Sequence, residues 1–146
     1  MEQDYIKTGK VKYVTLDFPL ESIHKNAFKA AEAARCAGAQ GKYWEMQARL
    51  FANQGAIGLT DLPSHAEALG LDKAAFQQCL ESGRYAEAIR KDLAAGQQAG
   101  VTGTPAFFVG VTEPNDAKVK TLRQLTGAQP YAAFQAAINS LLADQK

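Results

Sequence analysis

The sequence is poor in the residue types that most often build metal sites and nucleic-acid interfaces. Its 146 residues contain 2 Cys, 2 His and 1 Trp. The histidines, His24 and His65, have no third ligand at the spacing typical of a zinc site, so we expect no metal, and we expect no cofactor. The formal net charge is +1, which gives no reason to expect nucleic acid as a partner.

Long apolar runs are also missing. No stretch reaches the roughly 18–20 apolar residues of a membrane-spanning helix, so we expect no association with a membrane. The first residues, M-E-Q-D-Y-I-K, include no apolar region of the kind found in secretory signals. The chain as written is therefore predicted to be cytoplasmic.

The composition itself is that of a folded domain. Hydrophobic residues make up 47% of the chain and charged residues 21%, which supports a core and argues against disorder. A length of 146 residues favours one domain covering residues 1–146.

Periodicity and capping residues predict a strand, a block of helices, two strands and a last helix. Apolar and polar residues alternate over residues 10–18, which predicts a strand. Trp44, Met46, Leu50 and Phe51 are expected to supply core side chains from one helix. The predicted helices cover residues 27–39 and 42–53, a short stretch between Thr60 and Gly70, a stretch capped by Asp72, residues 84–99, and a stretch from Pro130. The two later strands are predicted at residues 106–110 and 118–125.

One stretch carries a specific resemblance. Residues 100–110 read G-V-T-G-T-P-A-F-F-V-G, in which glycines and a Thr-Pro step lead into an apolar strand. This resembles the cis-proline loop and following strand of the DsbA-like thiol-disulfide oxidoreductases, a branch of the thioredoxin superfamily. Residues 17–20 (D-F-P-L), 30–37 (A-A-E-A-A-R-C-A), 41–46 (G-K-Y-W-E-M) and 127–131 (G-A-Q-P-Y) are similar to that family in the same order.

The resemblance implies an α/β fold, an incomplete thioredoxin-like fold with an inserted all-helical subdomain. Residues 1–26 and 99–146 would form the thioredoxin-like part, and residues 27–98 the helical insertion. Pro105 would be cis, and Gly103, Thr104 and Pro105 would bind substrate. The backbone of Thr104 would pair with an extended peptide or unfolded protein. Members of this family work mostly in the periplasm.

The sequence departs from the family at its reactive motif. The family's C-x-x-C lies on a helix upstream of the segment that corresponds to residues 5–7, and no C-x-x-C occurs in this sequence. We therefore expect an N-terminally truncated, catalytically incomplete protein with no catalytic residues of its own. The strand before that helix is absent too, which would leave backbone groups unpaired on two strands. Direct pairing of those strands or a second copy could repair this, and we predict a homodimer or a higher oligomer.

Cys36 and Cys79 leave three interpretations open. They could be two buried thiols that pack as small apolar residues, or a structural disulfide between two helices. A reactive thiol is the third interpretation, but each cysteine lies among alanine or leucine residues, and burial raises a thiol pKa. Arg35 precedes Cys36, yet neighbours in sequence point to different sides of a helix.

Three functional hypotheses follow. The first is an oxidoreductase-family protein without its reaction, and the second is a non-catalytic module that binds peptides at the cis-proline loop by strand addition. The third is the related isomerase and glutathione-transferase branch, whose serine or glutathione site would lie near the same missing helix.

Overall fold

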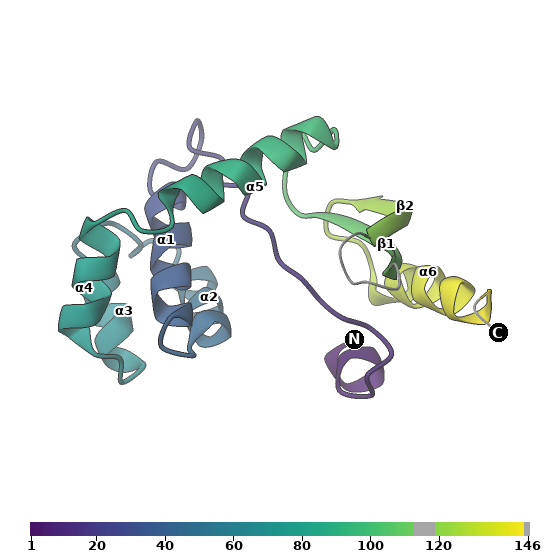
Figure 1. The fold of residues 1–146 in the computed structure, drawn as a ribbon, viewed down its shortest axis with the longest axis horizontal. Helices are drawn as coiled ribbons and strands as arrows, with labels where there is room; N and C mark the ends of the chain where they lie inside the picture. Colours follow the sequence, from purple (N-terminus) through teal and green to yellow (C-terminus); the bar gives the residue numbers. More distant parts are fainter. Residues whose placement is uncertain (113–118, 145–146) are drawn as a thin grey trace. The chain divides into compact units, whose positions relative to one another are not determined.

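The computed structural model describes residues 1–112 and 119–144 and divides the chain into two compact units (Figure 1). Leu16–Gly100 forms one, called here the helical unit. Met1–Thr15 and Val101–Lys146 form the other, called here the sheet unit. The predicted boundaries of a helical insertion at residues 27 and 98 stay a prediction.

The helical unit is built around one alanine-rich helix. α1 (Ala27–Gly38) contacts α2 (Tyr43–Ala52), α3 (Leu62–Ala68), α4 (Lys73–Glu81) and α5 (Ala86–Gln98). Three alanines of α1 are buried, and side chains this small allow neighbouring helices to approach closely. The larger side chains of the core come from the helices around α1. They include Met46, Leu50, Leu62, Phe76 and Leu80.

The core prediction for α2 is half right. Met46 and Leu50 lie four residues apart, share one helix face and are buried. Trp44 and Phe51 were expected beside them, but these side chains are 50% and 69% exposed. Seven positions separate Trp44 from Phe51, so both lie on another face of the helix, away from the core.

Among the described α-helices, α4 starts with a side-chain cap. The Asp72 carboxylate accepts a hydrogen bond from the Ala75 amide at 2.9 Å, which confirms it as the N-cap of α4. α3 begins one residue later than expected, with Asp61 rather than Thr60 at the N-cap position and a proline in its first turn.

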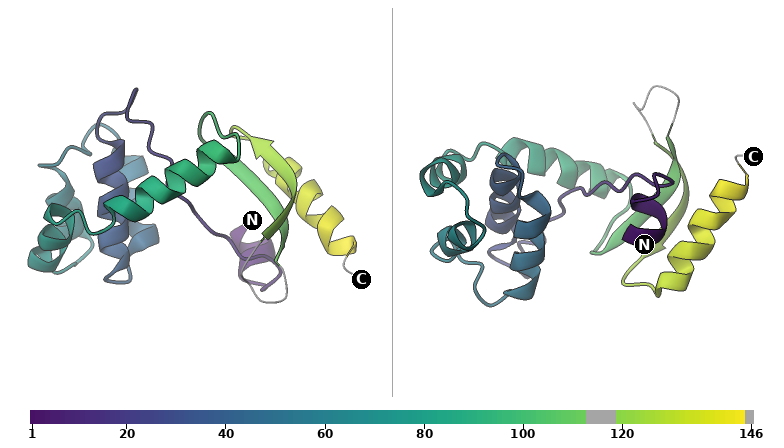
Figure 2. Two further views of the ribbon diagram at one scale, coloured as in Figure 1. Left: turned by 45° about the horizontal axis from the view of Figure 1, so that its top comes forward. Right: turned by 90° about the horizontal axis from the view of Figure 1, so that it is seen from below.

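The sheet unit has a π-helical turn η1 (Glu2–Ile6), an antiparallel pair β1 (Ala106–Thr112) and β2 (Val119–Thr126), and a last helix α6 (Tyr131–Ala143). Figure 2 shows α6 lying along one face of the two strands. Phe107 of β1 meets Phe134 of α6 edge to face, with ring centroids 4.8 Å apart. Lys118, which was predicted to start the second strand, lies outside the described residues.

Side-chain hydrogen bonds attach η1 to α6. The Tyr5 hydroxyl donates to Asn139 Oδ1 at 2.8 Å, and the Tyr131 hydroxyl donates to the Asp4 carboxylate. The hydrogen bond with Asp4 raises the pKa of Tyr131 to about 12, because losing the phenolic proton would place two negative charges side by side.

The strand predicted at residues 10–18 is wrong. Residues 11–20 have no regular secondary structure, and β1 and β2 form the two-stranded sheet that the described residues contain. Val14 and Leu16 are largely exposed. A strand is stabilised by a neighbour that pairs its backbone, and no described strand pairs with this segment. Residues 10–18 have the alternating pattern of a strand, but they do not pair with β1, as one of the two expected repairs required.

No helix in the described parts of the chain is both long enough and apolar enough to cross a membrane.

Candidate functional site: the Thr104–Pro105 loop and the edge of β1

The three residues predicted to bind substrate are consecutive and form the loop before β1. The Thr104–Pro105 peptide bond is cis. Thr104 and Pro105 are exposed, and Gly103 is half-buried. The Pro105 carbonyl accepts a hydrogen bond from the Gly127 amide at 2.8 Å, which ties the loop to the residue after β2.

That bond also fixes which backbone groups of β1 point away from β2. Ala106 faces Thr126 and Phe107 faces Leu125 in the register of the pair. Backbone groups alternate in direction along an antiparallel strand, so the N–H and C=O of Phe107 point toward β2 like the Pro105 carbonyl. Those of Ala106 and Phe108 therefore point outward.

Backbone groups on this outer side have no partner in the described chain. The sheet order is β1–β2, so β1 has one neighbouring strand among the residues described. The Thr104 N–H and C=O likewise take part in no backbone hydrogen bond within residues 1–112 and 119–144. We call the row made by Thr104, Ala106 and Phe108 the outer edge of β1.

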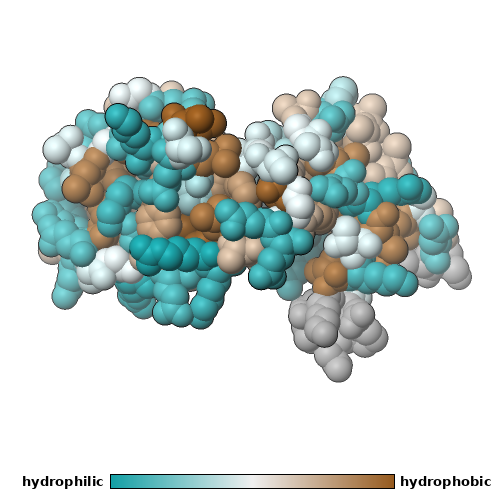
Figure 3. Space-filling model, turned by 90° about the horizontal axis from the view of Figure 1, so that it is seen from above, coloured by the Kyte–Doolittle hydropathy of each residue, from teal (hydrophilic) through white to brown (hydrophobic). Residues whose placement is uncertain are grey.

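One exposed aromatic side chain lies on this edge. Phe107 packs against α6, so the alternation of a strand turns Phe108 to the opposite face, where 41% of its surface is exposed. Figure 3 shows hydrophobic residues among hydrophilic ones on the face that it draws. An apolar side chain beside unpaired backbone groups is an arrangement that an extended peptide can use.

Gly110 allows a bulge beyond this edge. The register shifts between Val109 and Gly110, where the pairing skips one residue of β2. A Cβ on Gly110 would collide with the Lys120 carbonyl, so the close approach of the two backbones requires glycine here.

The two cysteines lie in the helical unit and form a disulfide. Cys36 of α1 and Cys79 of α4 have Cα atoms 5.9 Å apart, and 1% and 9% of their surfaces are exposed. Of the three interpretations, the structure shows the structural bridge. Since the sequence contains no other cysteine, these 146 residues hold no free thiol.

An ion network in the helical unit was not anticipated from the sequence. Arg35 of α1 donates from Nε to Asp17 Oδ2 at 2.6 Å and from its terminal nitrogen to Asp92 Oδ2 at 2.5 Å. The Asp17 amide also donates to Asp92 Oδ2 at 3.1 Å. Burial raises the pKa of the Asp17 carboxyl, the Asp92 charge adds to the rise, and Arg35 opposes it. The three residues are far apart in sequence and follow no periodic pattern.

The two histidines lie apart from one another in this unit. His65 is buried, its Nδ1 accepts from Arg49 Nε at 3.1 Å, and its Nε2 lies 2.7 Å from the Ala56 carbonyl. His24 lies in an exposed turn.

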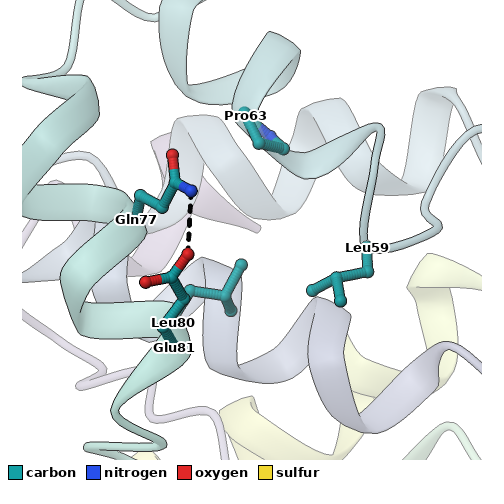
Figure 4. A pocket seen from close by; sticks show the side chains of 5 residues that line it. All are labelled: Leu59, Pro63, Gln77, Leu80 and Glu81. Carbon is teal, nitrogen blue, oxygen red and sulfur yellow. Dashed lines mark hydrogen bonds between the residues drawn. The ribbon is translucent and has the colours of Figure 1, made fainter.

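Between α3 and α4 lies a pocket of about 210 Å³ (Figure 4). Gln77 and Glu81 hydrogen-bond to each other across one of its walls. Its lining residues are Leu59, Pro63, Gln77, Leu80 and Glu81.

Comparison with known families covers nearly the whole chain. A family model described as Thioredoxin matches residues 1–140. The chain belongs to the thioredoxin family. Its fold is similar to that of alpha-DsbA1 from Wolbachia pipientis, with a TM-score of 0.79 over 98% of this chain and 74% of that one at 23% identity. The predicted DsbA-like, thioredoxin-like fold is confirmed.

The curated relatives of this thioredoxin-family chain are much longer proteins. An Na⁺/H⁺ antiporter NhaA 1 from Salinispora arenicola is 42% identical over 99 residues, which are 68% of this chain and 15% of that protein. An antiporter NhaA 1 from Mycobacterium sp. (strain KMS) is 37% identical over 66% of the chain and 16% of that protein. The chain thus spans about a sixth of the length of the curated relatives that it matches.

Proposed function

We propose that residues 1–146 hold an extended peptide along the Thr104–Pro105 loop and the outer edge of β1, and supply no thiol chemistry of their own. The observation that carries this proposal is the exposed Thr104 backbone without a partner at the start of an unpaired strand edge. In this proposal the chain contributes the substrate-positioning part of a DsbA-like protein.

The chemistry of disulfide exchange explains the second half of the proposal. Exchange needs a thiolate that attacks and a second thiol that resolves the mixed disulfide. Cys36 and Cys79 are bonded to each other inside the core of the helical unit, where neither sulfur meets solvent readily. A reacting dithiol would therefore come from outside these residues. This favours the binding-module hypothesis for the residues themselves.

Strand addition is the proposed mode of binding. An extended peptide beside β1 would exchange hydrogen bonds with Thr104, Ala106 and Phe108, and main-chain pairing of this kind gives affinity with little sequence preference. The exposed Phe108 ring would contact alternate side chains of the peptide, which favours apolar residues at every second position.

The disulfide also bears on the compartment. Structural disulfides form and persist in oxidising environments and are rare in the reducing cytoplasm. The Cys36–Cys79 bridge therefore supports an oxidising location, rather than the cytoplasmic one predicted for the chain as written.

The antiporter names do not extend the proposal to ion transport. The aligned segment is 15% of the Salinispora arenicola protein, so most of that protein has no counterpart here. What the match favours is a peptide-binding domain that also occurs as one part of larger proteins.

Backbone methylation of a peptide tests strand addition directly. The probe is a fluorescein-labelled, cysteine-free ten-residue peptide of alternating valine and serine, and binding is followed by fluorescence anisotropy. Only alternate N–H groups of a strand face one neighbour, so methylating all valine nitrogens or all serine nitrogens should give unequal results. We expect the affinity of one of the two methylated peptides to be at least tenfold weaker than that of the parent peptide, and the affinity of the other to differ less than threefold.

Thr104→Ala is the matched protein control, because it keeps the backbone and should leave affinity unchanged within about twofold. Equal loss of affinity with both methylated peptides, or no binding of the parent peptide at 1 mM, would overturn the proposal.

The proposed absence of thiol chemistry is tested by insulin reduction with dithiothreitol. We expect the background rate for the protein and for a Cys36→Ser, Cys79→Ser variant, and a faster rate that the variant loses would show that the bridge reacts.

A further inference from the structure

The pocket of the helical unit combines apolar walls with one carboxylate. Gln77, Leu80 and Glu81 line it from one face of α4, because residues three and four positions apart lie side by side on a helix. Pro63 in the first turn of α3 and Leu59 in the loop before it complete the lining. Figure 4 shows the two polar side chains on one side of the space, with the proline and Leu59 across from them.

The Glu81 carboxylate has a neutral partner. The Gln77 amide donates to Glu81 Oε1 at 2.8 Å, and no cation pairs with Glu81 in the part of the chain that the structure describes. Lys73, at the start of the same helix, pairs instead with Glu67 at 3.1 Å. The pocket therefore presents a negative charge that is not compensated, and such a charge complements a cation.

The volume and the walls select the shape of that cation. Pockets that hold whole drug-sized molecules measure roughly 300–1,000 Å³, so this space of about 210 Å³ fits a single side chain. Lysine and arginine both lay an apolar stem on apolar surface while the charged head reaches a polar group. One oxygen of Glu81 is already engaged by Gln77, which opposes the two-pronged pairing that arginine prefers and favours a compact ammonium group.

The rim of the pocket favours a protein as the source of this group. Leu59 is 60% exposed, so the apolar wall continues onto the surface beyond the pocket. A protein that presents the lysine would cover this rim and remove it from water, whereas a free amine would leave it exposed.

We propose that this pocket binds a lysine side chain presented by a partner protein. The methylene stem lies against Leu59, Pro63 and Leu80, and the ammonium group donates to the Glu81 carboxylate. The site belongs to the helical unit and is separate from the outer edge of β1, so it goes beyond the proposed function.

A chemical-shift titration of the ¹⁵N-labelled 146-residue chain tests the site. The probe is Nα-acetyl-lysine N-methylamide at constant ionic strength, and its norleucine analogue has the same four-carbon stem without the ammonium group. We expect amides of residues 59–63 and 77–81 to shift and saturate with a Kd of about 1–10 mM for the lysine probe, and about fivefold weaker binding of the norleucine analogue. Equal affinity for the two probes would overturn the proposal, as would the absence of a saturable shift at these amides.

Two charge-removing substitutions place the ammonium group. Glu81→Gln keeps the size of the side chain and should weaken binding of the lysine probe about fivefold, with no change for the norleucine analogue. Glu87→Gln is the matched control, because Glu87 is an exposed glutamate that pairs with Lys91 on α5 and does not line the pocket. This control should bind like the parent, and an equal loss in both variants would mean attraction by net charge alone and overturn the proposal.

A longer probe tests the source of the lysine. An acetylated leucine–lysine–leucine N-methylamide would also cover the apolar rim, so it should bind about fivefold more tightly than the single-residue probe, and Leu59→Ser should remove this gain. The free amine 1-pentylamine should bind no more tightly than the single-residue probe. If 1-pentylamine matched the three-residue peptide, the pocket would belong to a free amine and the partner protein would be excluded.

The valine–serine peptide separates this proposal from the proposed function. That peptide contains no lysine, so it should bind to Glu81→Gln as it binds to the parent. A chain that binds the valine–serine peptide but not the lysine probe overturns the lysine site and leaves the proposed function standing. The converse result overturns the proposed function and supports the lysine site.

Discussion

The helical unit and the sheet unit are stabilised in different ways. In the helical unit, α1 has four helical neighbours, a disulfide joins it to α4, and Arg35 pairs with two carboxylates from distant segments. In the sheet unit, two strands have one helix on one face, and both the outer edge of β1 and the side chain of Phe108 lack cover in the described chain. Both units expose large apolar side chains, Phe51 in the first and Phe108 in the second, but only in the second does one lie beside strand backbone that lacks a partner among the described residues.

The difference follows from the range of the interactions. A helix pairs its backbone with residues four positions away, so alanine-rich segments and caps suffice to form it. A strand needs a neighbour, and β1 obtains one through the hairpin with β2 while residues 11–20 obtain none. Local interactions therefore suffice to form the helices, whereas the outer edge of β1 has no second neighbouring strand among the described residues.

Two phenylalanine substitutions, one in each unit, should differ most in their effect on the free energy of unfolding. Phe76 of α4 is almost fully buried, so Phe76→Ala should lower the free energy of unfolding by about 3–5 kcal/mol through lost burial and a cavity. Phe108→Ala should cost about 1 kcal/mol, since much of its ring already meets water. Urea denaturation followed by circular dichroism gives both values, and equal losses would mean that the Phe108 ring is covered in solution.

Removing the disulfide should affect the helical unit nearly as much. The bridge closes a loop of 43 residues, and the chain-entropy model gives about 3–4 kcal/mol for a loop of that length. Cys36→Ala with Cys79→Ala should lower the unfolding free energy by that amount. Hydrogen exchange should speed up in α1 and α4 but not in β1 or α6, whereas acceleration throughout would show that the two units unfold as one.

Breaking the ion network should have an intermediate effect. Arg35→Met keeps the length of the side chain but leaves the Asp17 and Asp92 carboxylates without their cation. We expect a loss of about 2–3 kcal/mol, less than for a fully buried pair because 24% of the Arg35 side chain is exposed. Lys91→Met, which breaks the exposed pair with Glu87, is the matched control and should cause no measurable change.

Features that depend on neighbouring residues in the sequence were predictable. The Asp72 cap, the helices of the central block and the strand after Pro105 each follow from patterns within a few positions. The thioredoxin-like fold followed from motifs that resemble a family, and the family match confirms it. The loop of Gly103, Thr104 and Pro105 was located in the same way, and its role in binding stays a prediction.

Features that depend on distant contacts were not predictable. The alternation over residues 10–18 is a sound strand pattern, but pairing needs a partner strand that no local pattern supplies. Trp44 and Phe51 were assigned to the core because they are large and apolar, while the position of the neighbouring helices decides which face of α2 is covered. Arg35, Asp17 and Asp92 meet only through the tertiary fold.

The smallest predicted effect is a pH dependence confined to the helical unit. Burial raises the pKa of Asp17 above its ordinary value of 3.8. At a pH between 3.8 and the raised pKa, the Asp17 carboxyl is protonated in the folded protein but ionised in the unfolded chain. The stability that Asp17 contributes is therefore complete below about pH 3.8 and is lost as the pH rises through the raised pKa.

Urea unfolding of the parent and of Asp17→Asn at half-unit steps from pH 4 to pH 7 measures this contribution. Asparagine does not titrate, so the parent should lose stability relative to the variant as the pH rises, and the difference should level off above the raised pKa. If the parent instead gained stability relative to Asp17→Asn over this range, Arg35 would outweigh burial and the pKa of Asp17 would be lowered. Exchange rates in β1 and α6 should differ little between the two proteins at any pH, because Asp17 hydrogen-bonds to Arg35 and Asp92, which belong to the helical unit.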